Sequence, residues 1–271
     1  MKENRIERGQ SRGRMALIAL VALTALGVGL KFGYDALRDA YLEQCVIRDL
    51  AAQVEITSGK MVHPSTIAEE FGLKAGKNLA TIDFTKKRDE VLAKIPNLRA
   101  IHISRYLPSK VVIDAEERVP IAKMGIRGQK GVTGRVVDTE GVVFICQRGT
   151  QTLPTIVETQ TPGTRPGQHV TNRTRAALRL IEACHEPEYL ELGILEVDTA
   201  KHDFLVVTLG NYSRVKIRWE DMDGESPQSR TDLVKRLSLL RQAIRTKTTP
   251  ETVIWNVTIP GRVFADTQGK I

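Results

Sequence analysis

The hydrophobic pattern singles out one stretch near the N-terminus. Residues 15–30 read MALIALVALTALGVGL, without a charged side chain. As a helix these residues span about 24 Å, and an extension to Tyr34 gives about 30 Å, the thickness of the hydrocarbon core of a bilayer. The pattern therefore predicts a transmembrane helix over residues 15–34, between a tail at residues 1–14 and a linker at residues 35–45.

The charges on either side of this stretch predict its orientation. Five Lys and Arg stand against two Glu before it, whereas residues 31–50 carry three basic and four acidic side chains. Because basic flanks stay in the cytoplasm, we expect a cytoplasmic N-terminus and an extracytoplasmic bulk. A signal peptide cleaved at Ala25-Leu26-Gly27 is the alternative. The apolar sequence continues to Leu30, however, which favours a retained anchor.

Residues 46–122 carry the pattern strand, helix, helix, strand, strand. Two helices laid on one face of three strands would form a small α+β domain. The first predicted element is a strand at 54–56. Two helices follow: one opened by His63-Pro64-Ser65 and ended by Gly72, and one capped from Asp83 and ended before Pro96. Strands at 101–103 and 111–115 then flank the turn at Leu107-Pro108-Ser109.

Residues 123–266 read as a second, β-rich domain. We expect a mainly antiparallel sheet with two packed helices, so that the fold class of the chain is α+β, and a C-terminal tail at residues 267–271. The predicted elements are a hairpin of 136–138 and 142–144, a helix capped by Asn172, strands at 195–197, 204–209 and 215–219, a helix opened by Ser229 with a stripe of Leu233, Leu237, Leu240 and Ile244, and a last strand over 253–259.

Composition and motifs argue against catalysis. The chain is 41% hydrophobic and 27% charged, which excludes wholesale disorder and a polytopic membrane protein. The five histidines lack the HxxxH spacing of a helical metal site, and residues 72–78 lack the Ser or Thr of a phosphate loop. We therefore expect no enzyme activity, no metal and no cofactor. The net charge of +8 comes without the aromatic interleaving that stacks bases, so no nucleic-acid partner is expected.

The three cysteines lie far apart in the sequence and form no CxxC pair, which excludes a disulfide-stapled scaffold. Cys146 and Cys184 stand in apolar runs. We expect buried reduced thiols, with an oxidised pair as the alternative.

Several short motifs follow one another along the chain: VEITSG at 54–59, GKNL at 76–79, KIPNLRA at 94–100, RYLPS at 105–109, ERVPIA at 117–122 and VDTEGVVF at 137–144, followed by Leu153-Pro154. In their order and spacing they resemble the FtsQ/DivIB family of bacterial cell-division proteins. The resemblance extends over residues 45–266. Asn97 replaces a tryptophan that is usual in the family.

The resemblance implies a POTRA domain, a module that binds other polypeptides, at residues 46–122, and a family β domain at 123–266. It also implies a non-enzymatic, inner-membrane scaffold of the division septum that binds the single-pass proteins FtsB and FtsL and acts on septal peptidoglycan synthesis by FtsW and FtsI. A POTRA-type secretion or envelope-assembly factor and a secreted hydrolase are the alternative functions.

Candidate partner-binding residues follow from the same resemblance. In the family an FtsB segment adds as a strand beside the last strand of the β domain, and residues 254–264 match that strand here. Thr258 replaces the family's basic residue, and Pro260 removes a backbone donor. The candidates are Trp255, Val257, Thr258, Ile259, Val263 and Phe264. A second set marks the predicted domain junction: Glu117, Arg118, Pro120 and Lys123. Arg118 and Lys123 would there meet acidic residues of a partner coiled coil, with a solvated junction as the alternative.

Overall fold

The computed structural model describes residues 3–128, 134–159, 163–224, 226–246 and 254–266, without the side chains of residues 3–19, 22 and 266. The chain forms two compact units. The first comprises residues 1–57, 64–88 and 102–114, and the second residues 58–63, 89–101 and 115–271.

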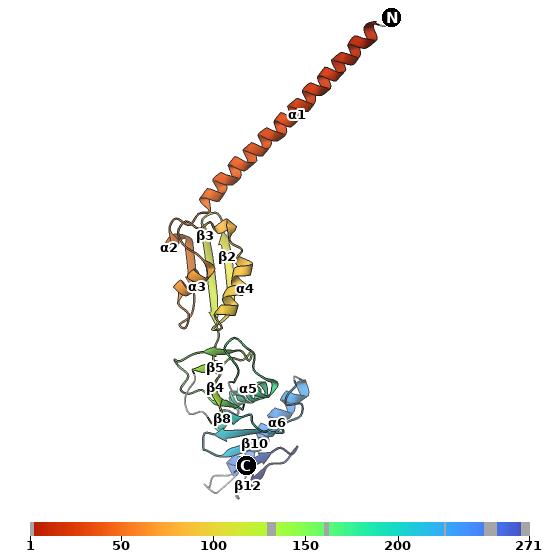
Figure 1. Cartoon of the computed structure of the whole chain (residues 1–271). Helices are drawn as coiled ribbons and strands as arrows, with labels where there is room; N and C mark the ends of the chain where they lie inside the picture. The colour runs from red at the N-terminus through yellow and green to blue at the C-terminus, as the bar shows by residue number, and fades with distance from the viewer. Residues whose placement is uncertain (1–2, 129–133, 160–162, 225, 247–253, 267–271) are drawn as a thin grey trace. The chain divides into compact units, whose positions relative to one another are not determined.

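The N-terminal helix α1 (Glu3–Gln44) is continuous over 42 residues (Figure 1). It includes nearly all of the predicted linker at 35–45. Within the described part of the chain, no helix is long and apolar enough to cross a membrane. The predicted span at 15–34 is thus not confirmed, and the side chains of residues 15–19 and 22 lie outside the described residues.

The small domain has the predicted order of elements. Strands β1 (Val54–Thr57), β2 (Leu98–Tyr106) and β3 (Lys110–Glu117) form a sheet in the order β1-β3-β2, with β1 parallel to β3. Helices α3 (Pro64–Phe71) and α4 (Phe84–Lys94) lie between β1 and β2 in sequence, and Asp83 caps α4 as expected by accepting from the Lys86 amide. The short helices α2 (Leu50–Gln53) and η1 (Leu79–Thr81) were not expected.

The second unit contains a nine-stranded sheet in the order β12-β11-β10-β9-β8-β7-β4-β5-β6. The sheet is mixed, because β4–β7, β7–β8 and β10–β11 pair in parallel, whereas the other five pairs are antiparallel. Its strands are β4 (Ala122–Ile126), β5 (Arg135–Val137), β6 (Val143–Ile145), β7 (Thr155–Glu158), β8 (Ile194–Asp198), β9 (Leu205–Leu209), β10 (Arg214–Ile217), β11 (Ile254–Val257) and β12 (Phe264–Asp266).

Two helices supply the apolar layer that covers one face of this sheet: α5 (Asn172–Cys184) and α6 (Pro227–Thr246). The cap of α5 is Thr171, whose hydroxyl accepts from the Thr174 amide, and not Asn172 as predicted. The predicted stripe of α6 is buried at Leu233, Leu237 and Leu240, which join β10 and β11 in one core. A short helix, η2 (Leu190–Leu192), precedes β8.

The end of the sheet differs from the expectation of one last strand over 253–259. β11 stops at Val257, and the chain turns through Pro260-Gly261, where Gly261 has the positive φ of 69° that favours glycine. The chain then returns as β12, antiparallel to β11. Residue 253 lies outside the described residues.

All three cysteines are buried free thiols; burial was predicted for Cys146 and Cys184 and not for Cys45. Burial raises the pKa of the Cys184 thiol to about 12. Thiolate chemistry is therefore suppressed at this residue.

Candidate partner-binding site

The two edges of the nine-stranded sheet are different. At the β6 edge, the Val143 amide donates to the Gln168 carbonyl at 3.0 Å, and the Gly167 amide donates to the Val143 carbonyl at 2.7 Å. The Asn97 side-chain amide donates to the Ile145 carbonyl at 2.7 Å. This edge is therefore covered by the chain itself.

The β12 edge has no such cover in the described part of the chain. β12 pairs with β11 on one side, and no described strand lies on the other. An open strand edge presents backbone donors and acceptors to which another chain can add as a strand. This edge is the candidate partner-binding site.

The predicted anchor residues divide into buried and exposed groups. Trp255 and Val257 are 5% and 0% exposed and belong to the core, so their side chains support β11 and cannot reach a partner. Val263 is partly buried against the same core. Ile259 and Phe264 are 47% and 44% exposed, which leaves them as the candidate apolar anchors near this edge.

Thr258 is occupied by a local contact. Its amide and hydroxyl both donate to the side-chain oxygen of Asn256, at 3.1 and 2.7 Å. The end of β11 is also fixed from the helical face, since the buried Arg236 donates to the Val257 carbonyl at 2.9 Å and to Asp232 at 2.8 Å. These contacts therefore hold β11, the strand with which β12 pairs, firmly in place.

A hollow lies on the sheet beside this edge. Lys216 lies in β10 and Arg218 comes just after the strand, two residues further along. The register places Lys216 next to Asn256 and Asn256 next to Phe264. The hollow has a volume of about 340 Å³ and is lined by Asp203, Phe204, Lys216, Arg218, Asn256 and Thr258. With two cations and one carboxylate, it suits an acidic side chain.

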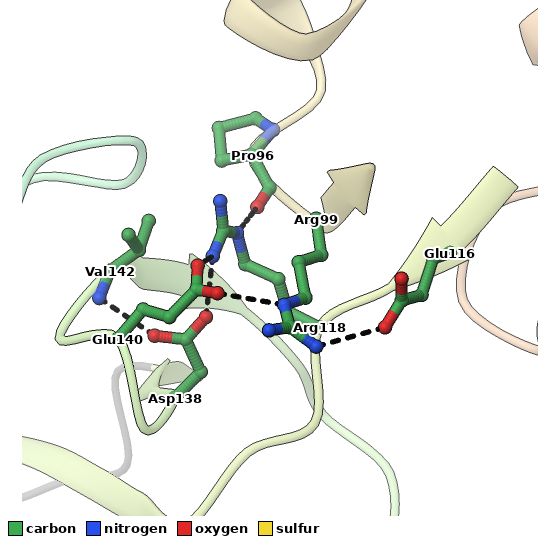
Figure 2. A network of polar contacts seen from close by, with 7 residues as sticks. All are labelled: Pro96, Arg99, Glu116, Arg118, Asp138, Glu140 and Val142. Carbon is green, nitrogen blue, oxygen red and sulfur yellow. Dashed lines mark hydrogen bonds and ion pairs between the residues drawn. The ribbon is translucent and has the colours of Figure 1, made fainter. Parts of the chain in front are cut away.

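The predicted junction residues face inward. Figure 2 shows Arg118 in a network with two acidic side chains: it donates to Asp138 at 2.5 Å and to Glu140 at 3.0 Å. Its Nε donates to the Pro96 carbonyl at 3.1 Å. Its side chain is 13% exposed and that of Asp138 only 5%. Arg118 is thus a largely buried, paired cation and does not offer its charge to a partner.

The network continues to the surface through Arg99. Its guanidinium donates to Glu140 at 2.8 Å and to Glu116 at 3.0 Å. Hydrogen bonds from Arg99 and Arg118 hold the pKa of the Glu140 carboxyl below its ordinary value. The same bonds raise the pKa of Arg99. Asp138 accepts from the Val142 amide at 2.8 Å, which ties the network to the turn before β6.

Glu117 also has an internal role. Its carboxylate accepts from the backbone amides of Lys60, Met61 and Val62 at 2.7 to 3.1 Å. Of the other two junction residues, Pro120 is half-buried, and Lys123 reaches the Gln151 carbonyl at 3.4 Å. The junction is therefore built mainly from structural contacts.

Sequence reasoning missed the hollow and the true edge strand. β12 has three residues, too few for a periodic pattern to be visible. The alternation of Arg214, Lys216 and Arg218 with apolar residues is typical of a strand with one polar face, but it does not show that Phe204 and Asn256 lie beside that face.

Comparison with known proteins gives two matches. Residues 51–118 match the model of the FtsQ-type POTRA domain. The chain is also similar to the cell division protein FtsQ of Corynebacterium glutamicum, with 26% identity over 92 residues. This alignment covers 34% of the chain and 39% of that relative, so the chain spans well under half the length of the curated relative it matches.

Proposed function

We propose that this chain, which carries an FtsQ-type POTRA domain and is similar to a cell division protein FtsQ, is a member of the FtsQ/DivIB family and a non-enzymatic scaffold of bacterial cell division. Its partners are single-pass division proteins of the FtsB and FtsL kind, through which it acts on the septal peptidoglycan synthase formed by FtsW and FtsI. Its working surface is the open β12 edge.

The contrast between the two sheet edges carries this proposal. The β6 edge is closed by residues 167–170 and by Asn97, whereas β12 is uncovered in the described structure. An added strand gains backbone hydrogen bonds at β12 and apolar contacts at Ile259 and Phe264. Pro260 has no backbone N–H, so it adds nothing to such pairing.

Charge gives the added segment a direction. The hollow lined by Lys216 and Arg218 lies on one face of the sheet. An acidic side chain of the partner that binds in this hollow fixes which face of the added strand is turned toward it. Specificity then comes from charge, and affinity from the strand and its apolar anchors.

The proposal includes attachment to the inner membrane by α1, with the N-terminus in the cytoplasm and the chain that follows α1 outside the cytoplasm. The uncharged run at 15–30 and its basic flank support it. From Leu20 to Tyr34 the described large apolar side chains of α1 are 55–72% exposed, as expected of a helix that lipid covers. In this setting the chain gathers at the division septum.

Copurification of the full chain with the FtsB-like and FtsL-like proteins of the same bacterium tests the proposal. We expect Phe264→Asp to weaken the complex by about 2 kcal/mol, some thirtyfold, because a charge is forced into an apolar contact. Leu190→Asp is the matched control, since Leu190 is 57% exposed in the same unit and away from β12. Equal binding by both variants would remove β12 as the site.

A further inference from the structure

A cavity of about 360 Å³ opens between α5 and the start of α6, and we call it the interhelical cavity. Its deeply buried lining includes three apolar side chains, since Ala183, Trp219 and Leu233 are 7%, 2% and 2% exposed. The volume lies in the range of about 300–1,000 Å³ that is typical of small-ligand sites. The cavity shares no lining residue with the hollow beside the β12 edge. It is therefore a separate feature of the second unit.

The two arginines that line the interhelical cavity are already engaged. Arg230 donates to the Glu186 carboxylate at 3.0 Å, and Arg179 donates to the Gly224 carbonyl. An anionic ligand would have to displace one of these acceptors before it could gain a hydrogen bond from either guanidinium. The charges present therefore do not favour an anion, although two cations lie at the cavity.

The carboxylates that line the cavity have acceptor capacity left over. Within the described residues, Glu182 of α5 accepts no hydrogen bond and forms no ion pair, and Arg230 engages one of the two oxygens of Glu186. Partial burial raises the pKa of the Glu182 carboxyl above its ordinary value. A carboxylate that loses water without gaining a donor is stabilised by a cation that brings donors of its own. The unused groups of the cavity thus suit a positively charged ligand.

We propose that the interhelical cavity binds a basic side chain, arginine or lysine, of a partner polypeptide. The methylene stem of such a side chain packs against the apolar lining at Trp219 and Leu233. Its charged head donates to Glu182 and to the open oxygen of Glu186. The inference goes beyond the β12 edge and rests on the proposed function in one respect, namely that the occupant belongs to another division protein.

The indole N–H of Trp219 reports on occupancy of the cavity. It donates to the Ser229 hydroxyl at 2.9 Å, and both residues line the cavity. The chain has two tryptophans, so the full chain in lipid nanodiscs, labelled with ¹⁵N-tryptophan, gives two indole signals in an NMR spectrum. The variant Trp219→Phe identifies the signal of Trp219.

Capped amino acids are the probes. We expect N-acetylarginine amide to shift the Trp219 signal in a saturable way at millimolar concentrations, and N-acetylcitrulline amide, its neutral isostere, to leave the signal in place. Methylguanidine has the cationic head without the stem or the peptide groups, and it should bind about tenfold more weakly. No saturable shift with N-acetylarginine amide, or equal binding of any of these probes, would overturn the inference.

A pair of charge-neutralising variants locates the cation. Glu182→Gln should lower the affinity for N-acetylarginine amide about tenfold, because it removes the unpaired charge and keeps the size of the side chain. Glu188→Gln is the matched control: Glu188 is an exposed carboxylate nearby that does not line the cavity, and the affinity should stay unchanged. Circular dichroism checks that both variants fold. Equal affinities of the two variants would contradict the assignment to Glu182.

The two proposals fail separately. If Phe264→Asp leaves copurification intact, the β12 site of the proposed function is wrong, whether or not the cavity binds the arginine probe. If Phe264→Asp weakens the complex but N-acetylarginine amide does not bind, the division scaffold stands and the interhelical site alone is refuted.

Discussion

At the scale of single residues, Arg118 shows how position in the sequence can mislead. It stands in ERVPIA, beside an acidic residue and two residues before a proline, and reads as a surface cation of a junction. The partners that bury it, Asp138 and Glu140, lie about twenty residues further along the chain. No local sequence pattern shows that Arg118 lies beside Asp138 and Glu140 in the folded chain.

We expect Arg118→Ala to destabilise the protein by about 3–5 kcal/mol, because it leaves the buried Asp138 carboxylate without its counter-ion. Arg99→Ala is the control. It removes an arginine from the same network whose side chain is 50% exposed, and it should cost at most about 1 kcal/mol. Chemical denaturation of both variants gives the two values. Similar losses of unfolding free energy in the two variants would show that burial does not determine how much each arginine contributes to stability.

Glu140 makes part of the stability depend on pH. Its pKa is lower in the folded protein, so it stabilises the fold above its ordinary pKa of 4.5 and loses this contribution as the pH falls through the folded value. We expect Glu140→Gln to be less stable than the parent chain at neutral pH, and the gap to narrow on acidification below about pH 4.5. Urea unfolding across that range measures the gap, and a constant gap would contradict the assignment.

At the scale of elements, the segment at residues 58–63 is held from two sides. Glu117 binds three of its amides, and Met61 packs against Val136 and Phe144 of the β5–β6 hairpin. Gly59 leaves room for the carboxylate, because a Cβ there would lie 2.2 Å from a Glu117 oxygen. One carboxylate thus organises a stretch that has no regular structure of its own.

Glu117→Gln tests this role. The amide keeps one acceptor oxygen but places an NH₂ group against backbone amides, so we expect a loss of about 1–3 kcal/mol in the free energy of unfolding. Glu116→Gln, one residue earlier, is the control and should be nearly neutral because its side chain is 50% exposed. Thermal unfolding compares the two variants. A neutral Glu117→Gln would mean that the amides of residues 60–62 find other partners.

The sequence predicted the elements whose pattern is local. The helices α3, α4, α5 and α6 and the β5–β6 hairpin follow from periodicity, caps and turn residues. The strands β4, β7 and β12 were missed. They have three to five residues each, and β4 and β7 pair in parallel with segments distant in sequence. Such strands are defined by their neighbours more than by their own residues.

At the scale of the whole molecule, the family and the site were predictable to different degrees. Ordered motifs identified the FtsQ-type POTRA domain, which the match at residues 51–118 confirms. The candidate site stays a prediction: its edge strand β12 was not foreseen, and of the six predicted residues Trp255, Val257 and Val263 pack in the core and Thr258 is held by Asn256. Trp255 and Val257 alternate like neighbours of a binding edge, yet α6 covers them. Which face a helix covers is decided by the whole fold.

Because the β6 edge is covered, the open β12 edge cannot by itself support the growth of a fibre. Head-to-tail growth of a fibre through the nine-stranded sheet needs two complementary free ends on every subunit, and the described residues of this sheet leave one. Another polypeptide can add a strand at the β12 edge alone. Two copies of the chain that pair through this edge form a closed dimer. The described sheet is in this way protected from polymerising through the surface that we propose for partner binding.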